Sequence, residues 1–326
     1  MMQIQKPNSN TNEFSLIDKY FKQQPISRSD VVLGIGDDAA LVRVPTNRLL
    51  VLAIDTLVEG VHFPQQTKAG DVGYKALAVN LSDLAAMGAE PAWITLALCL
   101  PEANSEWLGQ MSSGIYELAK QHQVQLIGGD TVRGPLSLTI QAHGFVPPDQ
   151  ALCRRGAKPG DKIYVSGTLG DAGLGLKVLQ EEYSLPNPEK EFVLQRLNRP
   201  SPRIQLGLLL RNLASSAIDI SDGLLADLGH ILESSQVGAE IEVEALPLSA
   251  VLKKISLIEA QHLALSAGDD YELCFTVSSD KESELLEKLN ASEVRCTCIG
   301  KIRKESGLKV VGWEGRLVAL GYRHFS

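Results

Sequence analysis

Aspartates placed beside small or apolar residues constrain this chain more than any other feature. Asp37 and Asp38 follow two glycines in segment 34–40, which reads Gly-Ile-Gly-Asp-Asp-Ala-Ala. Further aspartates in similar surroundings are Asp55, Asp83, Asp130 and Asp222. Each aspartate taken singly also fits a helix N-cap or a turn, and Asp130 and Asp222 both follow expected strands. The alternative is that these carboxylates share one site.

A shared carboxylate site carries an electrostatic cost that only cations relieve. Two carboxylates about 4 Å apart repel by roughly 4 kcal/mol at an effective dielectric constant near 20. Gathered acids also raise one another's pKa unless positive charge neutralises them. Oxygen ligands alone suit Mg²⁺, Ca²⁺ or Mn²⁺ and not zinc. A metal-binding role for the turn at Asp38 follows if the acids converge, with Asp37 shaping the turn.

The bulk composition is that of an ordinary globular protein. The chain has 326 residues, 44% hydrophobic and 21% charged, with a formal charge of −8. This length indicates two domains or one large one. No basic stripe stands out, which argues against a nucleic-acid partner. An acidic enzyme that handles phosphates must supply positive charge locally, through metal ions or a few Arg and Lys.

The cysteines and the ends of the chain predict a cytoplasmic protein. Five cysteines, an odd number in mostly apolar surroundings, read as reduced thiols. Residues 1–12 are polar, lack the apolar core of a signal peptide and are expected to be flexible. The apolar run 93–100 is too short to span a bilayer, so no membrane partner is expected.

Hydrophobic periodicity predicts a mixed α/β (α+β) fold in two domains. We expect a hairpin of strands 41–44 and 49–54, a helix from an Asp71 N-cap to Met87 with Gly88 after it, and a strand 124–127. Pro147 and Pro148 mark the boundary between domains 13–148 and 149–326. In the second domain, strands are expected at 162–166, 217–220, 239–243, 273–277, 296–301, 308–311 and 316–318, and helices at 204–213, 224–233 and 281–289.

Two glycine-rich segments suggest nucleotide phosphates but have competing interpretations. Segment 34–39 matches a dinucleotide fingerprint formally, yet it carries two carboxylates and a strand-like segment follows it. Segment 167–173 follows a strand and opens a helix, so it either cradles a phosphate or allows close helix–strand packing, which we favour. The motifs of P-loop enzymes and protein kinases are absent from the sequence.

Seven motifs in order resemble the thiamine-phosphate kinase family, part of the aminoimidazole ribonucleotide synthetase-like superfamily. They are segments 34–40, 55–63, 75–88, 127–131, 154–161, 218–223 and 268–274, and the likeness extends from about Glu13 to Phe325. The resemblance implies the superfamily's two-domain fold, with an N-terminal domain that binds ATP and Mg²⁺ and forms a homodimer through its sheet. It also implies ATP-dependent phosphorylation of thiamine monophosphate to thiamine diphosphate.

The same resemblance assigns roles to individual residues. It implies magnesium binding by six aspartates: Asp38, Asp55, Asp83, Asp130, Asp219 and Asp222. It implies ATP contacts by Gly129, Asp130, Arg154 and Ser221, and thiamine monophosphate contacts by His62, Asp269 and Tyr322. No covalent catalyst is expected, and Asp130 and Asp222 are expected to be the most critical residues.

Three positions depart from the pattern of the family. Ala53 and Ile54 stand where members often have Ser and Thr as magnesium ligands, so a contact there must use backbone oxygen. Asp269 stands where Glu is usual, and Tyr322 occupies a site that can also be Trp. The alternatives are another ATP-using enzyme of the superfamily with a different acceptor, and a non-catalytic metal-binding scaffold. Mutually repelling carboxylates argue against the scaffold.

Overall fold

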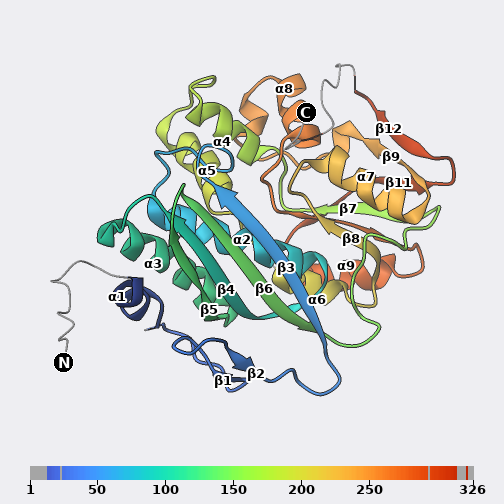
Figure 1. The fold of residues 1–326 in the computed structure, drawn as a ribbon. Helices are drawn as coiled ribbons and strands as arrows, with labels where there is room; N and C mark the ends of the chain where they lie inside the picture. The colour runs from blue at the N-terminus through green and yellow to red at the C-terminus, as the bar shows by residue number, and fades with distance from the viewer. Residues whose placement is uncertain (1–12, 23, 293, 314–320, 322–326) are drawn as a thin grey trace, which may run out of the picture. The chain divides into compact units, whose positions relative to one another are not determined.

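The computed structural model describes residues 13–22, 24–292, 294–313 and 321 (Figure 1). The chain divides into two compact units that exchange short segments. The first unit comprises Met1–Pro45, Ile54–Leu77 and Ala92–Ala142, and the second comprises Thr46–Ala53, Ala78–Pro91 and His143–Ser326. The expected terminal strand 316–318 and Tyr322 lie outside the described residues.

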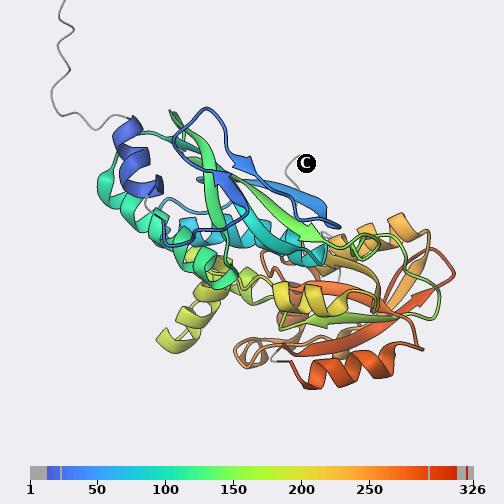
Figure 2. The same ribbon diagram turned by 90° about the horizontal axis from the view of Figure 1, so that it is seen from below.

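The N-terminal half is built on a four-stranded sheet in the order β3-β6-β4-β5, with β4 and β5 parallel. Figure 2 shows α2 and α3 on one face of this sheet. The elements of this half are α1 (Glu13–Ile17), the π-helical turn η1 (Asp18–Lys22), β1 (Val31–Leu33), β2 (Leu41–Val42), β3 (Leu49–Val58), α2 (Ala69–Ala86), β4 (Glu90–Leu100), α3 (Ser105–His122), β5 (Gln125–Arg133) and β6 (Ser137–Val146).

The two faces of this sheet differ in burial. On β6, Leu138 and Ile140 are buried, whereas Thr139 between them hydrogen-bonds Thr56 of β3 at 2.8 Å near solvent. On β3, Leu52 and Ile54 alternate with less exposed neighbours and are 56% and 61% exposed. Because successive strand residues point to opposite faces, the helices cover one face and the other carries apolar side chains toward solvent.

Helix α2 ends as the sequence predicts but begins earlier. Gly88 has φ 63°, and the Gly88 and Ala89 amides donate to Ala85 and Leu84 oxygens at 2.9 and 2.8 Å, which closes the last turn. Asp71 lies in the first turn and is not the N-cap, because the helix begins at Ala69. An acidic residue in the first turn remains favourable for the helix dipole.

The C-terminal half holds a six-stranded sheet in the order β12-β9-β11-β7-β10-β8. Its pairs are antiparallel except β12 with β9, which is parallel. The elements of this half are β7 (Lys162–Ser166), α4 (Asp171–Leu179), α5 (Asn187–Asn198), α6 (Ile204–Leu210), β8 (Ala214–Asp219), α7 (Leu224–Ser235), β9 (Gly238–Glu242), η2 (Val243–Ala245), η3 (Leu252–Lys254), α8 (Leu257–Ser266), β10 (Leu273–Val277), α9 (Glu282–Asn290), β11 (Cys296–Arg303) and β12 (Gly307–Val311).

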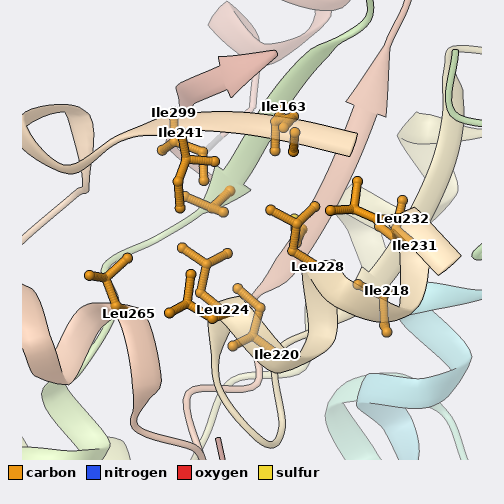
Figure 3. Close-up of a cluster of buried hydrophobic side chains, with 14 of the residues drawn as sticks. Ile163, Ile218, Ile220, Leu224, Leu228, Ile231, Leu232, Ile241, Leu265 and Ile299 are labelled. Atoms are coloured by element: carbon orange, nitrogen blue, oxygen red, sulfur yellow. The ribbon is translucent and has the colours of Figure 1, made fainter. Parts of the chain in front are cut away.

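The core of this half forms where α7 packs on the sheet (Figure 3). Leu224, Leu228 and Ile231 recur at helical spacing on α7 and are fully or almost fully buried against sheet residues that include Ile163 and Ile241. Burying side chains of this size contributes about 1.5–3 kcal/mol each. This packing places the start of α7 at the end of β8, where the Ser221–Gly223 turn lies.

The predicted pairing of two N-terminal strands was wrong. The expected hairpin of 41–44 with 49–54 does not form, because β2 pairs with β1 and β3 pairs with β6. The polar segment that contains Asn187–Asn198 forms helix α5. Its Pro188 lies in the first helical turn, where a missing N–H costs little. The described helices include none with the length and apolar character needed to cross a membrane.

The close contact between α6 and the end of α2 leaves no room for a side chain at Gly207. A Cβ on Gly207 would collide with the backbone oxygen of Ala85, whereas a Cβ on Gly229 of α7 would meet nothing within 4 Å. We expect Gly207→Ala to lower the free energy of unfolding by about 1–3 kcal/mol. Gly229→Ala should be neutral or stabilising by up to about 1 kcal/mol. Urea unfolding of both variants checks this, and equal stabilities would contradict the packing.

Candidate active site

The best-defined part of the candidate site is the Ser221–Gly223 turn between β8 and α7. The backbone N–H groups of Ser221, Asp222 and Gly223 donate to one oxygen, Oδ2 of Asp227, at 3.1, 3.0 and 3.0 Å. Burial is the main cause that raises the pKa of Asp227 to about 7, the charges of Asp219 and Asp222 contribute to this rise, and the Gly223 and Asp222 N–H groups oppose it. The side chains of Ser221 and Asp222 are half-buried at this turn.

Asp219 is the last residue of β8, two residues before Ser221, and is almost fully buried. Ser82 Oγ donates to Asp219 Oδ2 at 2.7 Å and joins α2 to β8 within the second unit. Burial raises the pKa of Asp219, and the negative charge of Asp222 adds to the rise, while Ser82 and the positive charge of Arg154 oppose it. Asp83 follows Ser82 on α2 and is half-buried, so the structure brings Asp83, Asp219 and Asp222 to one region.

Asp269 is held against the same turn. Its backbone N–H donates to the Ser221 oxygen at 2.8 Å, and a Cβ on neighbouring Gly268 would meet that oxygen at 2.5 Å. Asp269 adopts φ 68°, a left-handed conformation that costs a non-glycine residue of order 1 kcal/mol and persists where the surroundings enforce it. Gly321 also packs here, since a Cβ on it would lie 2.8 Å from the Asp222 oxygen.

Arg154 contributes charge from an exposed position. Its side chain is exposed, and its backbone oxygen accepts a 3.3 Å hydrogen bond from Ser235 at the end of α7. Its positive charge acts on Asp219, as does the negative charge of Asp222, so these three charged residues of the second unit interact electrostatically.

Gly129 and Asp130 lie within β5 and not in the turn after it. The β4–β5 register shifts between Ile94 and Thr95, which marks a bulge just before these residues. Gly129 has φ 155°, and a Cβ there would collide with the Leu96 oxygen, so the close strand approach requires glycine. Asp130 pairs with the exposed Ala97 and is itself exposed, with its Oδ1 accepting the Thr131 N–H at 2.9 Å.

The edge of β5 is covered by the chain that precedes β1. The Gln24 side-chain amide donates to the Leu126 oxygen at 2.6 Å, and its oxygen accepts the Leu126 N–H at 2.9 Å. Gln24 thus pairs with the strand edge as a backbone peptide does and steadies β5 three residues before Gly129.

Asp37 and Asp38 are neighbours in the turn before β2, but within the described part of the chain only Asp37 is shown to hydrogen-bond the turn through its side chain. Asp37 Oδ1 accepts the Asp38 N–H at 2.9 Å, so Asp37 shapes the turn. Asp38 is exposed, and β2, not a helix, follows the turn. A Cβ on Gly36 would lie 3.5 Å from Lys22 Nζ, so a lysine ammonium stands beside this acidic turn.

Asp55 and His62 flank the end of β3. Asp55 is half-buried on the strand face opposite exposed Ile54 and Thr56. His62 Nδ1 accepts the Val58 N–H at 3.0 Å, so the neutral imidazole carries its proton on Nε2. Asp55 and Asp130 occupy strands at opposite edges of the four-stranded sheet, so this sheet does not bring the two carboxylates together.

Among the described residues, no group of three or more His, Cys, Asp or Glu side chains is arranged to hold a metal ion. Asp219 and Asp222 nevertheless form a pair of oxygen donors whose charges oppose each other. Mg²⁺ is commonly held by one or two carboxylates together with substrate phosphates, so this pair fits it.

Three backbone N–H groups of the glycine-rich segment 167–173 are engaged within the protein. The N–H groups of Gly167, Leu169 and Gly170 donate to Arg295 oxygen, Pro247 oxygen and Asp270 Oδ2 at 2.9, 3.1 and 2.7 Å. A Cβ on Gly173 would collide with Ala267. The observation favours the packing interpretation of these glycines.

Three buried acids in this region were missed in the sequence analysis: Asp227, Asp270 and Glu272. Glu272 accepts Arg203 Nε at 2.6 Å, Arg196 Nη2 at 3.0 Å and Ser166 Oγ at 2.5 Å. The only sequence signal was their proximity to the recognised motifs, because burial of an acid depends on partners far along the chain.

Comparison with known proteins identifies the chain's relatives. The family models for the N-terminal and C-terminal domains of AIR synthase related proteins match residues 36–146 and 158–312. The thiamine-monophosphate kinase of Escherichia coli (strain K12) is 49% identical over 320 residues, covering 96% of this chain and 98% of that protein. This chain belongs to the thiamine-monophosphate kinase family.

Solved structures agree with this membership and with the two-domain fold of AIR synthase related proteins. A thiamine-monophosphate kinase structure from Stenotrophomonas maltophilia K279a superposes with TM-score 0.86 at 48% identity, covering 93% of this chain and 98% of that one. A structure described as AaThiL complexed with AMPPCP and TMP superposes with TM-score 0.77 at 31% identity, covering 100% and 99%. The match to kinase-family structures thus spans both halves of the chain.

The buried carboxylate Asp270 predicts a pH dependence of stability. Its pKa is raised to about 8, mainly by burial and in part by the charges of Asp171 and Glu272, while Arg196 and the Gly170 N–H oppose the rise. An acid with a raised folded-state pKa stabilises the protein fully below its unfolded-state pKa of about 3.9, and this contribution is lost as pH rises toward 8.

We therefore expect Asp270→Asn to flatten the pH profile of unfolding. Relative to this variant, wild-type stability should fall by up to about 1.4 kcal/mol per pH unit between pH 5 and 8. Urea unfolding of both proteins across this range gives the difference directly. A difference that stays constant with pH would show that Asp270 ionises normally in the folded protein.

Proposed function

We propose that this chain transfers the γ-phosphoryl group of ATP to the phosphate of thiamine monophosphate and forms thiamine diphosphate. The observation that carries the proposal is identity of about half the residues with thiamine-monophosphate kinases over nearly the whole chain. A 31% identical structure over the full chain was solved with AMPPCP, a non-hydrolysable ATP analogue, and TMP. Binding of ATP and thiamine monophosphate by this chain follows as part of the proposal.

The proposed ATP contacts are Gly129, Asp130, Arg154 and Ser221. At Gly129 the absence of a side chain lets the β4 and β5 backbones approach closely, while Arg154 is exposed and positively charged. An exposed guanidinium suits a phosphate because its fork of N–H donors matches phosphate oxygens. Ser221 presents a half-buried hydroxyl from a turn whose backbone is already held by Asp227.

Magnesium would be held by Asp38, Asp55, Asp83, Asp130, Asp219 and Asp222, and it would neutralise and align the phosphate oxygens during transfer. The donor chemistry supports this assignment, because every member is a carboxylate and Asp219 and Asp222 repel each other without a cation. The remaining contribution of the chain is positioning. The acceptor phosphate is already ionised at neutral pH, so direct in-line transfer needs no strong general base.

The thiamine end of the acceptor is proposed to meet His62, Asp269 and Tyr322. The thiazolium ring is cationic, so the half-buried carboxylate of Asp269 suits it electrostatically. The left-handed backbone of Asp269 and its hydrogen bond to Ser221 keep this carboxylate beside the proposed ATP contact. Gly321, which precedes Tyr322 in the sequence, packs against Asp222.

The proposal is tested by product formation. Incubation with ATP, Mg²⁺ and a panel of phosphorylated acceptors, scored by product mass, should yield thiamine diphosphate from thiamine monophosphate in preference to the other acceptors. Excess chelator should abolish turnover. Preference for another acceptor would assign the chain to a different reaction of this fold, and full turnover in chelator would exclude the magnesium mechanism.

The same assay tests the most critical residue. Asp130→Asn should keep the fold, because Asp130 is exposed, and lower kcat by about 100-fold or more. Asp149→Asn replaces an exposed aspartate outside the proposed site and serves as the matched control. Equal kinetics for the two variants would remove Asp130 from the site.

We also propose a homodimer formed through the open face of the four-stranded sheet. Leu52 and Ile54 of β3 and Val132 of β5 are exposed, and Val132 lies on the same strand face as Asp130. Exposed apolar patches of this kind mark interfaces, and a second copy presents the same patch in a two-fold arrangement.

Leu52→Glu should shift the protein from dimer to monomer, because a charge would be buried at the centre of the proposed interface. Leu257→Glu is the matched control, since Leu257 is 63% exposed on α8, which is not part of the proposed interface. Light scattering after size exclusion measures both masses. A wild-type monomer, or a Leu52→Glu dimer, would reject the proposed interface.

A cytoplasmic location and a domain boundary near Pro148 complete the proposal. All five cysteines are unpaired, which suits a reducing compartment. The two family models match residues 36–146 and 158–312, and the gap between these matches supports a boundary between domains 13–148 and 149–326.

A further inference from the structure

Asp227 has the geometry of an internal anion at a helix N-terminus. It lies four residues after Gly223 in the first turn of α7 and is 3% exposed. One carboxylate oxygen accepts three successive backbone N–H groups, those of Ser221, Asp222 and Gly223. Gly223 has φ 122°, which turns these amides toward a common point.

Successive N–H groups at a helix N-terminus are a ready site for phosphate. Here the chain's own carboxylate occupies it, so these amides are engaged within the protein. The turn therefore offers its side chains to ligands, namely the Ser221 hydroxyl and the Asp222 carboxylate. Three N–H groups converge on one oxygen of Asp227, so this side chain restrains all three residues of the turn.

The opposite side of the turn is restrained by backbone packing. Asp269 N–H donates to the Ser221 oxygen, and a Cβ on Gly223 would lie 2.8 Å from the Ser266 oxygen. The turn is thus held between the 266–269 segment and the Asp227 carboxylate. Loss of Asp227 would free three N–H groups and leave Ser221 and Asp222 fixed from one side.

We propose that Asp227 is a positioning residue that orients Ser221 and Asp222 toward the magnesium-bound nucleotide. This assignment rests on the proposed function, since it takes Asp222 as a magnesium ligand and Ser221 as an ATP contact. Asp227 does not itself touch the nucleotide, and it closes the backbone amides of the turn to phosphate.

The test compares Asp227→Asn and Asp227→Ala with a matched control, Asp161→Asn. Asp161 is also buried and also accepts a backbone N–H, that of Lys158 at 3.0 Å, together with Ser215 Oγ at 2.5 Å. It contacts the start of β8, whereas Ser221 follows the end of that strand. The measurements are the Mg²⁺ concentration for half-maximal rate, KM for each substrate, and thermal stability.

We expect Asp227→Ala to raise the half-activating Mg²⁺ concentration about tenfold and Asp227→Asn about threefold, because residues that orient metal ligands change affinity on this scale. KM for ATP should rise more than KM for thiamine monophosphate. Asp161→Asn should lose stability and keep the wild-type Mg²⁺ requirement. Where Asp227→Ala does not fold, Asp227→Asn against Asp161→Asn decides by the same criterion.

Two results separate this assignment from the proposed function. Asp227 variants that need no more Mg²⁺ than Asp161→Asn would overturn the positioning role. A wild-type protein that makes no thiamine diphosphate would instead reject the proposed acceptor. In that case, calorimetry of Mg²⁺-dependent AMPPCP binding on the same variants still tests Asp227, because it needs no acceptor.

Discussion

Buried carboxylates bonded to backbone N–H groups and arginines hold together the part of this protein on which its candidate site depends. Asp227 accepts three amides of the Ser221–Gly223 turn, Asp270 accepts the Gly170 N–H, and Glu272 accepts Arg196 and Arg203. Removing a carboxylate from water is costly unless such donors replace the solvent. Each acid therefore stabilises one specific backbone arrangement, and a neutral apolar core would leave that arrangement unspecified.

This use of internal acids explains how an acidic chain can be built for phosphate chemistry without a phosphate-binding loop. Asp270 accepts the Gly170 N–H before α4, and Asp227 accepts the Ser221, Asp222 and Gly223 N–H groups before α7, so these amides are not free for a ligand. In the proposed function, side chains such as Arg154 and cations held by exposed or half-buried acids would supply the phosphate contacts. A cation at Asp219 and Asp222 would favour the charged form of Asp219, whose pKa is raised by burial and by the charge of Asp222.

Local sequence patterns predicted several helices and strands correctly. They gave wrong predictions where strand pairing depends on residues far along the chain. Strand β7 and the start of α7 were predicted at their observed residues, because burial on one side gives a clear period. The predicted hairpin of 41–44 with 49–54 was wrong because β3 pairs with β6, more than 80 residues away. The local turn sequence around Pro45 carries no information about this distant partner strand. Asp130 was placed after a strand, but a bulge before Gly129 lets β5 continue through it. The family motifs located the candidate residues, and the roles given to them remain predictions.

The sequence by itself determined the mixed α/β class, the family and the identity of the candidate aspartates, because these depend on residue types and short-range spacing. The tertiary structure alone decided which aspartates are exposed at a strand or turn, as Asp38 and Asp130 are, and which are buried anchors, as Asp227 and Asp270 are. An aspartate has the same composition and local signal in both roles. Its environment is set by partners such as Ser82 for Asp219 and Gly170 for Asp270, which lie 137 and 100 residues away along the chain.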